Sequence, residues 1–303
     1  MASFPLTVIR TAFRIADHLA PQLAGRAAFE LFCRTPHPTR VSEKERRALE
    51  QAAPFMAEAR LHRLTTASGC VAAHDFRPPE GVARRGTVLV VHGWRSRADH
   101  MAALIDALRR AGSRVIALDL PGHGKSSGRR LNMANAVDAV ATAGQWFGPF
   151  DAIVGHSFGG AVAVNAVVGS IRGVAPVATR RLALISAPNS MPAYFADFGR
   201  MMELGTRTQT ALFGHVERVA GNPLENFVGA TQLAEVEVPT LVLHAPDDKE
   251  VPPENARAYA AAGRHVRLVW APGLGHRRIV AGPGVLAELA GFVAAPRVRE
   301  TAH

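Results

Sequence analysis

Cysteine, aromatic residues and long apolar runs are all scarce in this 303-residue chain. Only Cys33 and Cys70 occur, and they form no C-x-x-C pair, so neither a disulfide framework nor a redox motif is expected. No apolar run reaches the roughly 18 residues that a membrane-spanning helix requires. Arg10 and Arg14 interrupt the N-terminal apolar segment, which therefore lacks the continuous core of a secretory signal. The expected location is the cytoplasm.

Lysine is also scarce, although the formal net charge is +10. The positive charge is nearly all arginine, and lysine occurs only at Lys44, Lys125 and Lys249. Arg-Arg pairs are scattered along the chain, no basic block is present, and aromatic residues make up only 6% of it. Nucleic-acid binding needs a concentrated basic patch, often with interleaved aromatics. We expect no nucleic-acid partner.

The motifs of metal and phosphate sites are missing as well. The 13 histidines include no H-E-x-x-H or similar metal-ligand spacing. The glycine-rich stretch 122–126 lacks the upstream spacing of a phosphate-binding loop. We therefore predict no metal and no cofactor.

What the chain does contain is an alternation of short apolar runs and helical segments. Hydrophobic residues make up 48% of the chain, enough for a sizeable core. Such alternation is typical of a doubly wound, mostly parallel sheet in an α/β fold. Two earlier segments, 61–66 and 71–76, fit an antiparallel hairpin at the sheet edge. The expected parallel strands are 87–91, 115–118, 152–154, 182–185, 241–243 and 266–269.

Residues 1–60 are predicted to be an N-terminal helical extension. Apolar residues recur there at helical spacing, and the charged Arg10 and Arg14 lie off this stripe. We expect the stripe to pack on the core, and contact of a basic amphipathic helix with a membrane surface is the alternative. The stripe consists of Leu6, Ile9, Phe13, Ala16 and Ala20.

A segment rich in Met and Phe, residues 189–235, interrupts the alternation and contains no strand pattern. Its position between two strands predicts a short helical lid, and ordinary helix core is the bland alternative. The resulting domains are the extension 1–60, the core 61–188 with 236–298, and the lid 189–235. Candidate substrate contacts in the lid are Met191, Phe195, Phe198, Met202 and Phe213.

Reactive residue types follow three of the expected strands. Ser157 lies at the apex of a Gly-x-Ser-x-Gly turn between a strand and a helix. Asp247 and Asp248 follow the strand at 241–243, and His276 follows the last strand. Ligands of open α/β sheets bind at the carboxyl ends of strands. A serine needs a base to become a nucleophile, histidine can be that base, and a carboxylate orients its ring.

Five landmarks in this order resemble the α/β-hydrolase superfamily over roughly residues 61–295. They are His92-Gly93-Trp94, Asp119-Leu120-Pro121-Gly122-His123-Gly124, Gly155-His156-Ser157-Phe158-Gly159, Asp248-Lys249-Glu250-Val251-Pro252 and Gly275-His276. The resemblance implies Ser157 as nucleophile, His276 as base and Asp248 as acid partner, with Asp247 as the alternative. It also implies that the amides of Trp94 and Phe158 stabilise the oxyanion.

The predicted function is that of a serine hydrolase that cleaves a carboxylic ester or related acyl bond in a small molecule. A serine at the turn argues against the members of the superfamily that use a carboxylate nucleophile. His156, beside Ser157, is a further candidate substrate contact, and a packing role is the alternative. Two rival functions are an acyltransferase that uses the same three residues and a non-catalytic ligand-binding member of the fold.

Overall fold

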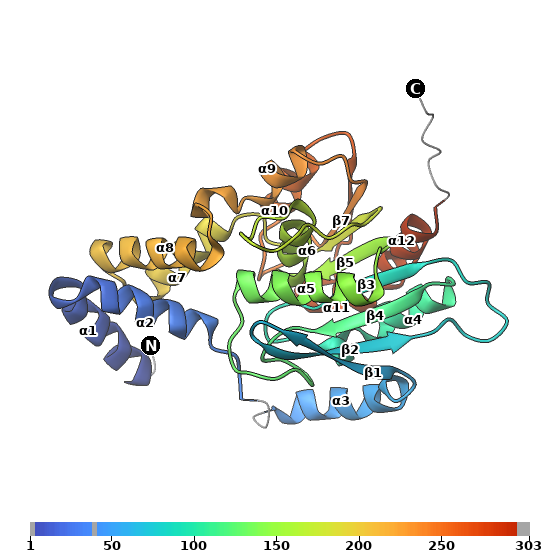
Figure 1. Ribbon diagram of the computed structural model, residues 1–303, viewed down its shortest axis with the longest axis horizontal. Helices are drawn as coiled ribbons and strands as arrows, with labels where there is room; N and C mark the ends of the chain where they lie inside the picture. Colours follow the sequence, from blue (N-terminus) through green and yellow to red (C-terminus); the bar gives the residue numbers. More distant parts are fainter. Residues whose placement is uncertain (1–3, 38–40, 296–303) are drawn as a thin grey trace.

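The predicted α/β architecture is confirmed by the computed structural model, which describes residues 4–37 and 41–295. An eight-stranded sheet has the order β1-β2-β4-β3-β5-β6-β7-β8 (Figure 1). β1 and β2 form the expected antiparallel hairpin at one edge, β2 also pairs antiparallel with β4, and the remaining pairs are parallel. The strands are β1 (Arg60–Thr66), β2 (Gly69–Phe76), β3 (Thr87–Val91), β4 (Arg114–Asp119), β5 (Ala152–His156), β6 (Leu182–Ile185), β7 (Thr240–His244) and β8 (Val266–Trp270).

Helices cover both faces of the sheet because alternate residues of the buried strands point to opposite sides. On β3, Leu89 and Val91 belong to one core, and Val88 and Val90 belong to the other. The first face is covered by α5 (Met133–Phe147), α6 (Phe158–Val168) and α10 (Glu254–Ala260). The second face is covered by α3 (Glu43–Met56), α4 (Ala102–Arg110) and α12 (Pro283–Ala294).

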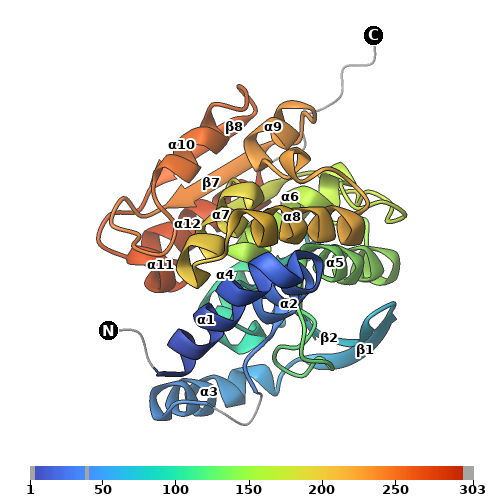
Figure 2. The ribbon, with the colours of Figure 1, turned by 90° about the vertical axis from the view of Figure 1, so that its left-hand side faces the viewer.

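Beyond the carboxyl ends of the strands lies a layer of four helices that we call the cap (Figures 1 and 2). It consists of α1 (Phe4–Leu19), α2 (Pro21–Cys33), α7 (Met191–Met202) and α8 (Thr206–Ala220). Two shorter pieces, η2 (Leu224–Asn226) and α9 (Gly229–Ala234), lead from α8 back to β7. Among residues 4–37 and 41–295, no helix combines the length and the apolarity that crossing a membrane would need.

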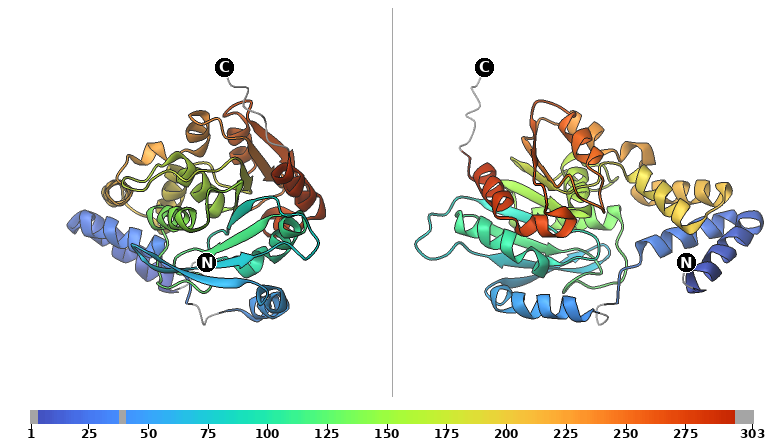
Figure 3. Two further views of the ribbon diagram at one scale, coloured as in Figure 1. Left: turned by 45° about the vertical axis from the view of Figure 1, so that its right-hand side comes forward. Right: turned by 180° about the vertical axis from the view of Figure 1, so that it is seen from behind.

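The N-terminal region does not act as one packing unit (Figure 3). α1 and α2 pack mainly against α7 and α8, whereas α3 lies apart from them and packs beside α4 and η1 (Ala98–Met101). Phe55 of α3 stacks on Phe76 of β2 at 4.9 Å between ring centroids. The expected extension 1–60 is therefore divided, in the described residues, between the cap and one face of the sheet.

Polar contacts and one close backbone approach join the two helix pairs of the cap. The Asp17 carboxylate accepts the Thr208 N–H at 2.7 Å, at the start of α8, where the N-cap residue Gly205 has no side chain to do so. Arg10 forms an ion pair with Glu203 at 2.9 Å. Gly25 contacts α8 so closely that a Cβ on it would lie 2.6 Å from the Leu212 nitrogen.

Candidate active site

The turn between β5 and α6 holds Ser157 in a strained backbone conformation. Its φ is 53° and its ψ is −127°, in a region that residues with a Cβ rarely adopt. The Ser157 N–H donates to the Ile185 carbonyl at 2.8 Å, which ties the turn to β6. A Cβ on Gly159 would collide with the carbonyl oxygens of Val91 and His92. The end of the neighbouring strand β3 can approach the turn this closely only because residue 159 is glycine. The serine is thus presented at the carboxyl edge of the sheet.

The structure brings His276 next to Ser157, although 119 positions separate the two residues in the sequence. The Nε2 atom of His276 lies 3.0 Å from the Ser157 Oγ, and its Nδ1 atom lies 2.8 Å from an oxygen of Asp248. His276 belongs to the short helix α11 (Gly275–Arg278) after β8, and Asp248 lies in the loop after β7. Side chains from three strand ends therefore form one hydrogen-bonded chain.

The Asp248 carboxylate stays ionised at neutral pH. Burial alone would raise its pKa, but hydrogen bonds from His276 and from the Val251 and Glu250 amides outweigh burial and lower the pKa to about 2. A carboxylate can only accept hydrogen bonds, so the Nδ1 atom of His276 carries the proton. The Nε2 atom is then the ring nitrogen that faces the Ser157 hydroxyl, at 3.0 Å.

Asp247 has a different place from its neighbour. Its carboxylate accepts the Gly273 N–H at 2.8 Å and is exposed, so it braces the loop that precedes His276. Of the two adjacent acids, Asp248 hydrogen-bonds to the imidazole, whereas Asp247 hydrogen-bonds to the Gly273 amide. The geometry therefore favours Asp248 over Asp247 as the partner of His276.

Both residues that the resemblance implies as oxyanion donors border Ser157. Phe158 is the first residue of α6, where helix N–H groups have no partner within the helix. Trp94 follows Gly93, whose backbone is so near that an added Cβ would lie 2.8 Å from the Ser157 Cβ. The rings of Trp94 and Phe158 meet edge to face with centroids 5.4 Å apart.

Two buried histidines fix the loop that carries Trp94. His92 accepts the Leu120 N–H on Nε2 at 2.9 Å and donates from Nδ1 to the Gly93 carbonyl at 2.7 Å. Burial lowers the pKa of His92 to about 3, so the ring is neutral and can do both. His123 accepts the Arg95 N–H at 3.1 Å in the same way. Their hydrogen bonds give both histidines a positioning role.

His156 is buried and packs against His276, with the two ring centroids 5.0 Å apart. Its Nε2–H donates to the backbone carbonyl of His276 at 2.9 Å, and burial lowers its pKa to about 4. Within the described residues its Nδ1 atom has no hydrogen-bond partner. The expectation that His156 contacts substrate differs from this placement, because the ring is buried beneath His276 and its one donor is engaged there.

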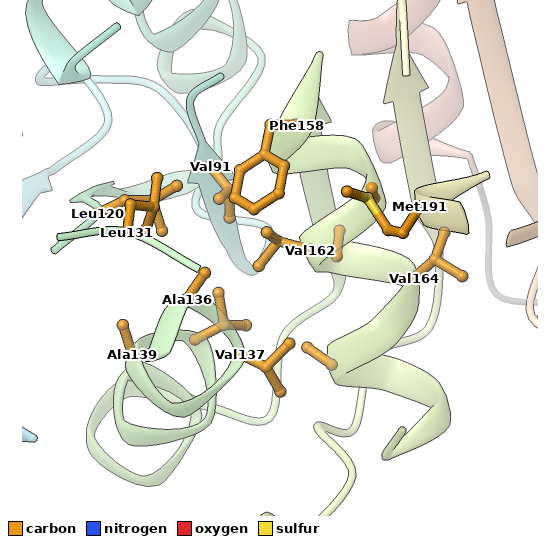
Figure 4. Packing of buried hydrophobic residues seen from close by; sticks show 14 of the residues in the cluster. Val91, Leu120, Leu131, Ala136, Val137, Ala139, Phe158, Val162, Val164 and Met191 are labelled. Carbon is orange, nitrogen blue, oxygen red and sulfur yellow. The ribbon is translucent and has the colours of Figure 1, made fainter. Parts of the chain in front are cut away.

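An apolar cavity lies beside Phe158, which Figure 4 shows at the start of α6 between Val91 and Met191. Its volume is about 20 Å³, room for about one water molecule. Asn132 supplies the single polar side chain in its wall. The lining residues are Phe29, Phe32, Asn132, Met133, Ala134, Phe158, Met191, Phe195, Val216, Val219, Ala220, Leu224 and Phe227.

The cavity includes some of the expected lid contacts and omits others. Met191 and Phe195, one helical turn apart on α7, line it. Phe198 and Met202 continue the same helix face beyond the cavity, and both are buried in the cap. Phe213 lies on α8 one turn before the lining residue Val216. The Met and Phe content of the segment singled out residues that are mostly buried in the cap, but composition could not indicate which of them line the cavity.

Phe29 and Phe32 of α2 line the cavity but are not among the predicted substrate contacts. Two apolar residues three positions apart can share one helix face, and this spacing does not indicate which element covers that face. The five landmarks of the resemblance all lie after residue 60, so no motif connected these two residues with Ser157. Only the contact of α2 with α7 and α8 reveals them as cavity residues.

Comparisons with known proteins agree with this architecture. The model of the Alpha/beta hydrolase family matches residues 88–289. The dihydrolipoyllysine-residue acetyltransferase component of the acetoin cleaving system of Cupriavidus necator is 38% identical over 118 residues. That match covers 35% of this chain and only 31% of the relative, so the chain spans about a third of the relative's length.

Two solved structures resemble the whole core. A thermophilic esterase of Thermogutta terrifontis, solved with propionate bound, has a TM-score of 0.61 at 16% identity and covers 81% of this chain and 98% of its own. A membrane phospholipase A, described as a bacterial virulence factor, has a TM-score of 0.59 at 19% identity, covering 82% of this chain and 90% of its own. At such low identity these similarities establish the fold.

Proposed function

The chain belongs to the α/β-hydrolase family, and on that premise we propose that it is a serine hydrolase that cleaves an ester through an acyl-enzyme on Ser157. The observation that carries the proposal is the hydrogen-bonded chain from the Ser157 Oγ through His276 to Asp248, with distances of 3.0 and 2.8 Å. The arrangement matches the needs of acyl transfer, because a hydroxyl, a base and an orienting carboxylate lie in sequence.

In the first half of the reaction, the Ser157 Oγ attacks the ester carbonyl carbon while its proton passes to Nε2 of His276. The resulting imidazolium is stabilised by Asp248 and returns the proton to the departing alcohol. Water then gives a proton to His276 and attacks the acyl carbon. The bond between that carbon and the Ser157 Oγ breaks, His276 returns the proton to the Oγ, and the acid is released. The amides of Trp94 and Phe158 would stabilise the oxyanion of both steps, and one such donor is typically worth about 3 kcal/mol.

A carboxylic ester is the proposed substrate because the nearby cavity is apolar and no positively charged side chain lines it. A related thioester fits the same chemistry. The second candidate is acyl transfer to an alcohol or thiol, since one relative is named as an acetyltransferase component. Hydrolysis with and without added acceptor alcohols separates the two: an acyltransferase forms mainly the new ester, whereas a hydrolase forms mainly the acid.

The proposed nucleophile is tested with a fluorophosphonate probe. The Ser157 Oγ is expected to displace fluoride from phosphorus, and peptide mass spectrometry should locate the adduct at Ser157. Ser157→Ala should abolish labelling and lower kcat for a p-nitrophenyl ester by about 10⁴-fold or more, with an unchanged circular dichroism spectrum. Turnover retained in a folded Ser157→Ala protein would refute the assignment.

A further inference from the structure

The cavity beside Phe158, the residue that follows Ser157, joins two parts of the chain that are far apart in sequence. Phe32 of α2 contacts Phe195 of α7 with ring centroids 4.5 Å apart, and it also contacts Trp94 at 5.7 Å. Phe29, one turn earlier on α2, lies 6.4 Å from Phe195. A series of ring contacts thus connects the loop of Trp94, the proposed oxyanion loop, with α2.

Contacts with the rest of the protein fix the position of α2, and this keeps Phe29 and Phe32 in place beside the cavity. The hydrogen bond from Thr208 to Asp17 and the close approach of Gly25 to α8 hold α1 and α2 against the other half of the cap. Beyond α2, the Leu131 N–H donates to the Cys33 carbonyl at 2.8 Å. The helix is therefore anchored both to α8 and to the loop that leads into α5.

The chemistry of the cavity selects for apolar groups. Its one polar side chain is that of Asn132, whose oxygen is already engaged because it accepts the Asn135 N–H at 2.9 Å and caps α5. A charge placed among these apolar walls would lose its water and find too few polar partners to replace it. The volume of about 20 Å³ has room for about one water molecule. An alkyl chain can therefore enter the cavity only if the aromatic side chains of its walls move apart.

We propose that α2 forms one wall of the substrate site, and that Phe29 and Phe32 bind the alkyl chain of the ester and limit its length. This inference rests on the proposed function of Ser157. It assigns the N-terminal helices to substrate binding as well as to stability. The substrate class that it names is an ester with an unbranched apolar chain whose length is set by the gap between α2 and α7.

The test measures how fast alkyl fluorophosphonates with four-carbon and eight-carbon chains modify Ser157. Each methylene that gains a buried site is worth about a fourfold gain in rate. Phe32→Ala and Phe29→Ala should enlarge the cavity and raise the ratio of eight-carbon to four-carbon rates by about 15-fold, equivalent to two further buried methylenes. Phe32→Trp narrows the gap and should lower the ratio at least about fourfold.

Phe13→Ala is the matched control, because Phe13 is a buried phenylalanine of α1 that does not line the cavity. Its ratio should stay within about twofold of that of the unmodified chain. If Phe32→Ala fails to fold, as judged by thermal denaturation, Phe32→Leu and Phe32→Trp carry the test.

Unchanged ratios in the variants of Phe29 and Phe32, or an equal shift in Phe13→Ala, would overturn the inference while leaving Ser157 as the nucleophile. Absence of any adduct on Ser157 of the unmodified chain would instead overturn the proposed function. The two failures are therefore distinguishable in one data set.

Discussion

The carboxyl edge of the sheet and the cap are held by different kinds of interaction. At the edge, hydrogen bonds of backbone groups fix the important residues. The Ser157 N–H donates to the Ile185 carbonyl, and the Asp248 carboxylate accepts hydrogen bonds from two backbone amides. In the cap, side chains make the main contacts between helices, through apolar rings and through Asp17 and Glu203. Backbone constraints leave little freedom for substitution, whereas ring contacts can be exchanged for others of similar volume.

The comparison indicates how the two regions divide the work. The proposed proton-transfer chain would tolerate only small errors in distance, and its members are placed by strand ends, turns and amide hydrogen bonds. A binding wall must be apolar and of the right shape, which several combinations of side chains satisfy. We therefore expect changes at the edge to affect rate strongly, and changes in the cap to affect stability and chain-length preference moderately.

The largest effect is expected for Asp248→Asn, a change at the carboxyl edge of the sheet. The amide can no longer stabilise an imidazolium or fix the tautomer of His276, so kcat should fall about 10⁴-fold. Asp247→Asn is the control within the same loop, because Asp247 bonds to Gly273 and not to the imidazole. Its kcat should change little. Steady-state kinetics on a p-nitrophenyl ester decide, and the reverse ranking would make Asp247 the partner.

The buried histidines of the edge should make stability depend on pH. Their folded pKa values, about 3 for His92 and about 4 for His156, lie below the unfolded value of about 6.5. Between pH 4 and 6.5 the unfolded chain therefore binds more protons than the folded chain. The free energy of unfolding should fall with decreasing pH in this window, by up to about 1.4 kcal/mol per pH unit for each histidine.

Urea denaturation at pH 7, 6 and 5 measures this slope. His156→Gln keeps an N–H donor for the His276 carbonyl but removes one titrating group, so its slope should be shallower by up to about 1.4 kcal/mol per pH unit. A slope identical to that of the unmodified chain would show that His156 is protonated in the folded protein as readily as in the unfolded one.

The smallest expected effect concerns the cap. Asp17→Ala leaves the first turn of α8 without its acceptor and should lower the melting temperature by about 2 to 4 °C. Labelling of Ser157 should continue. Arg14→Ala removes only an exposed ion pair with Glu203 and should change the melting temperature by less than about 1 °C. If both variants melt alike, the hydrogen bond from Thr208 does not anchor the cap.

Local patterns predicted the strands of the sheet and the helices of the cap, but not how the helices of the cap pack on one another. The apolar runs at 87–91 and 182–185 coincide with β3 and β6, because a buried parallel strand needs apolar residues on both faces. The order of a serine, an aspartate and a histidine at strand ends also followed from the strand pattern, and the family resemblance selected Asp248 from the two adjacent acids. Phe198 and Phe29 illustrate the limit, since a helix stripe reports that a face is buried and not which element covers it.

The sequence by itself determined the strands, the turn at Ser157 and the residue types that acyl chemistry needs, because these depend on periodicity and short-range backbone constraints. The resemblance implied Asp248, and the tertiary structure decided that it is Asp248 rather than Asp247 that meets His276. Tertiary structure alone decided that His156 bonds to a backbone carbonyl and that α2 closes the cavity beside Phe158. Those outcomes depend on contacts between distant segments, whose relative placement is set by packing of the whole core rather than by neighbouring residues.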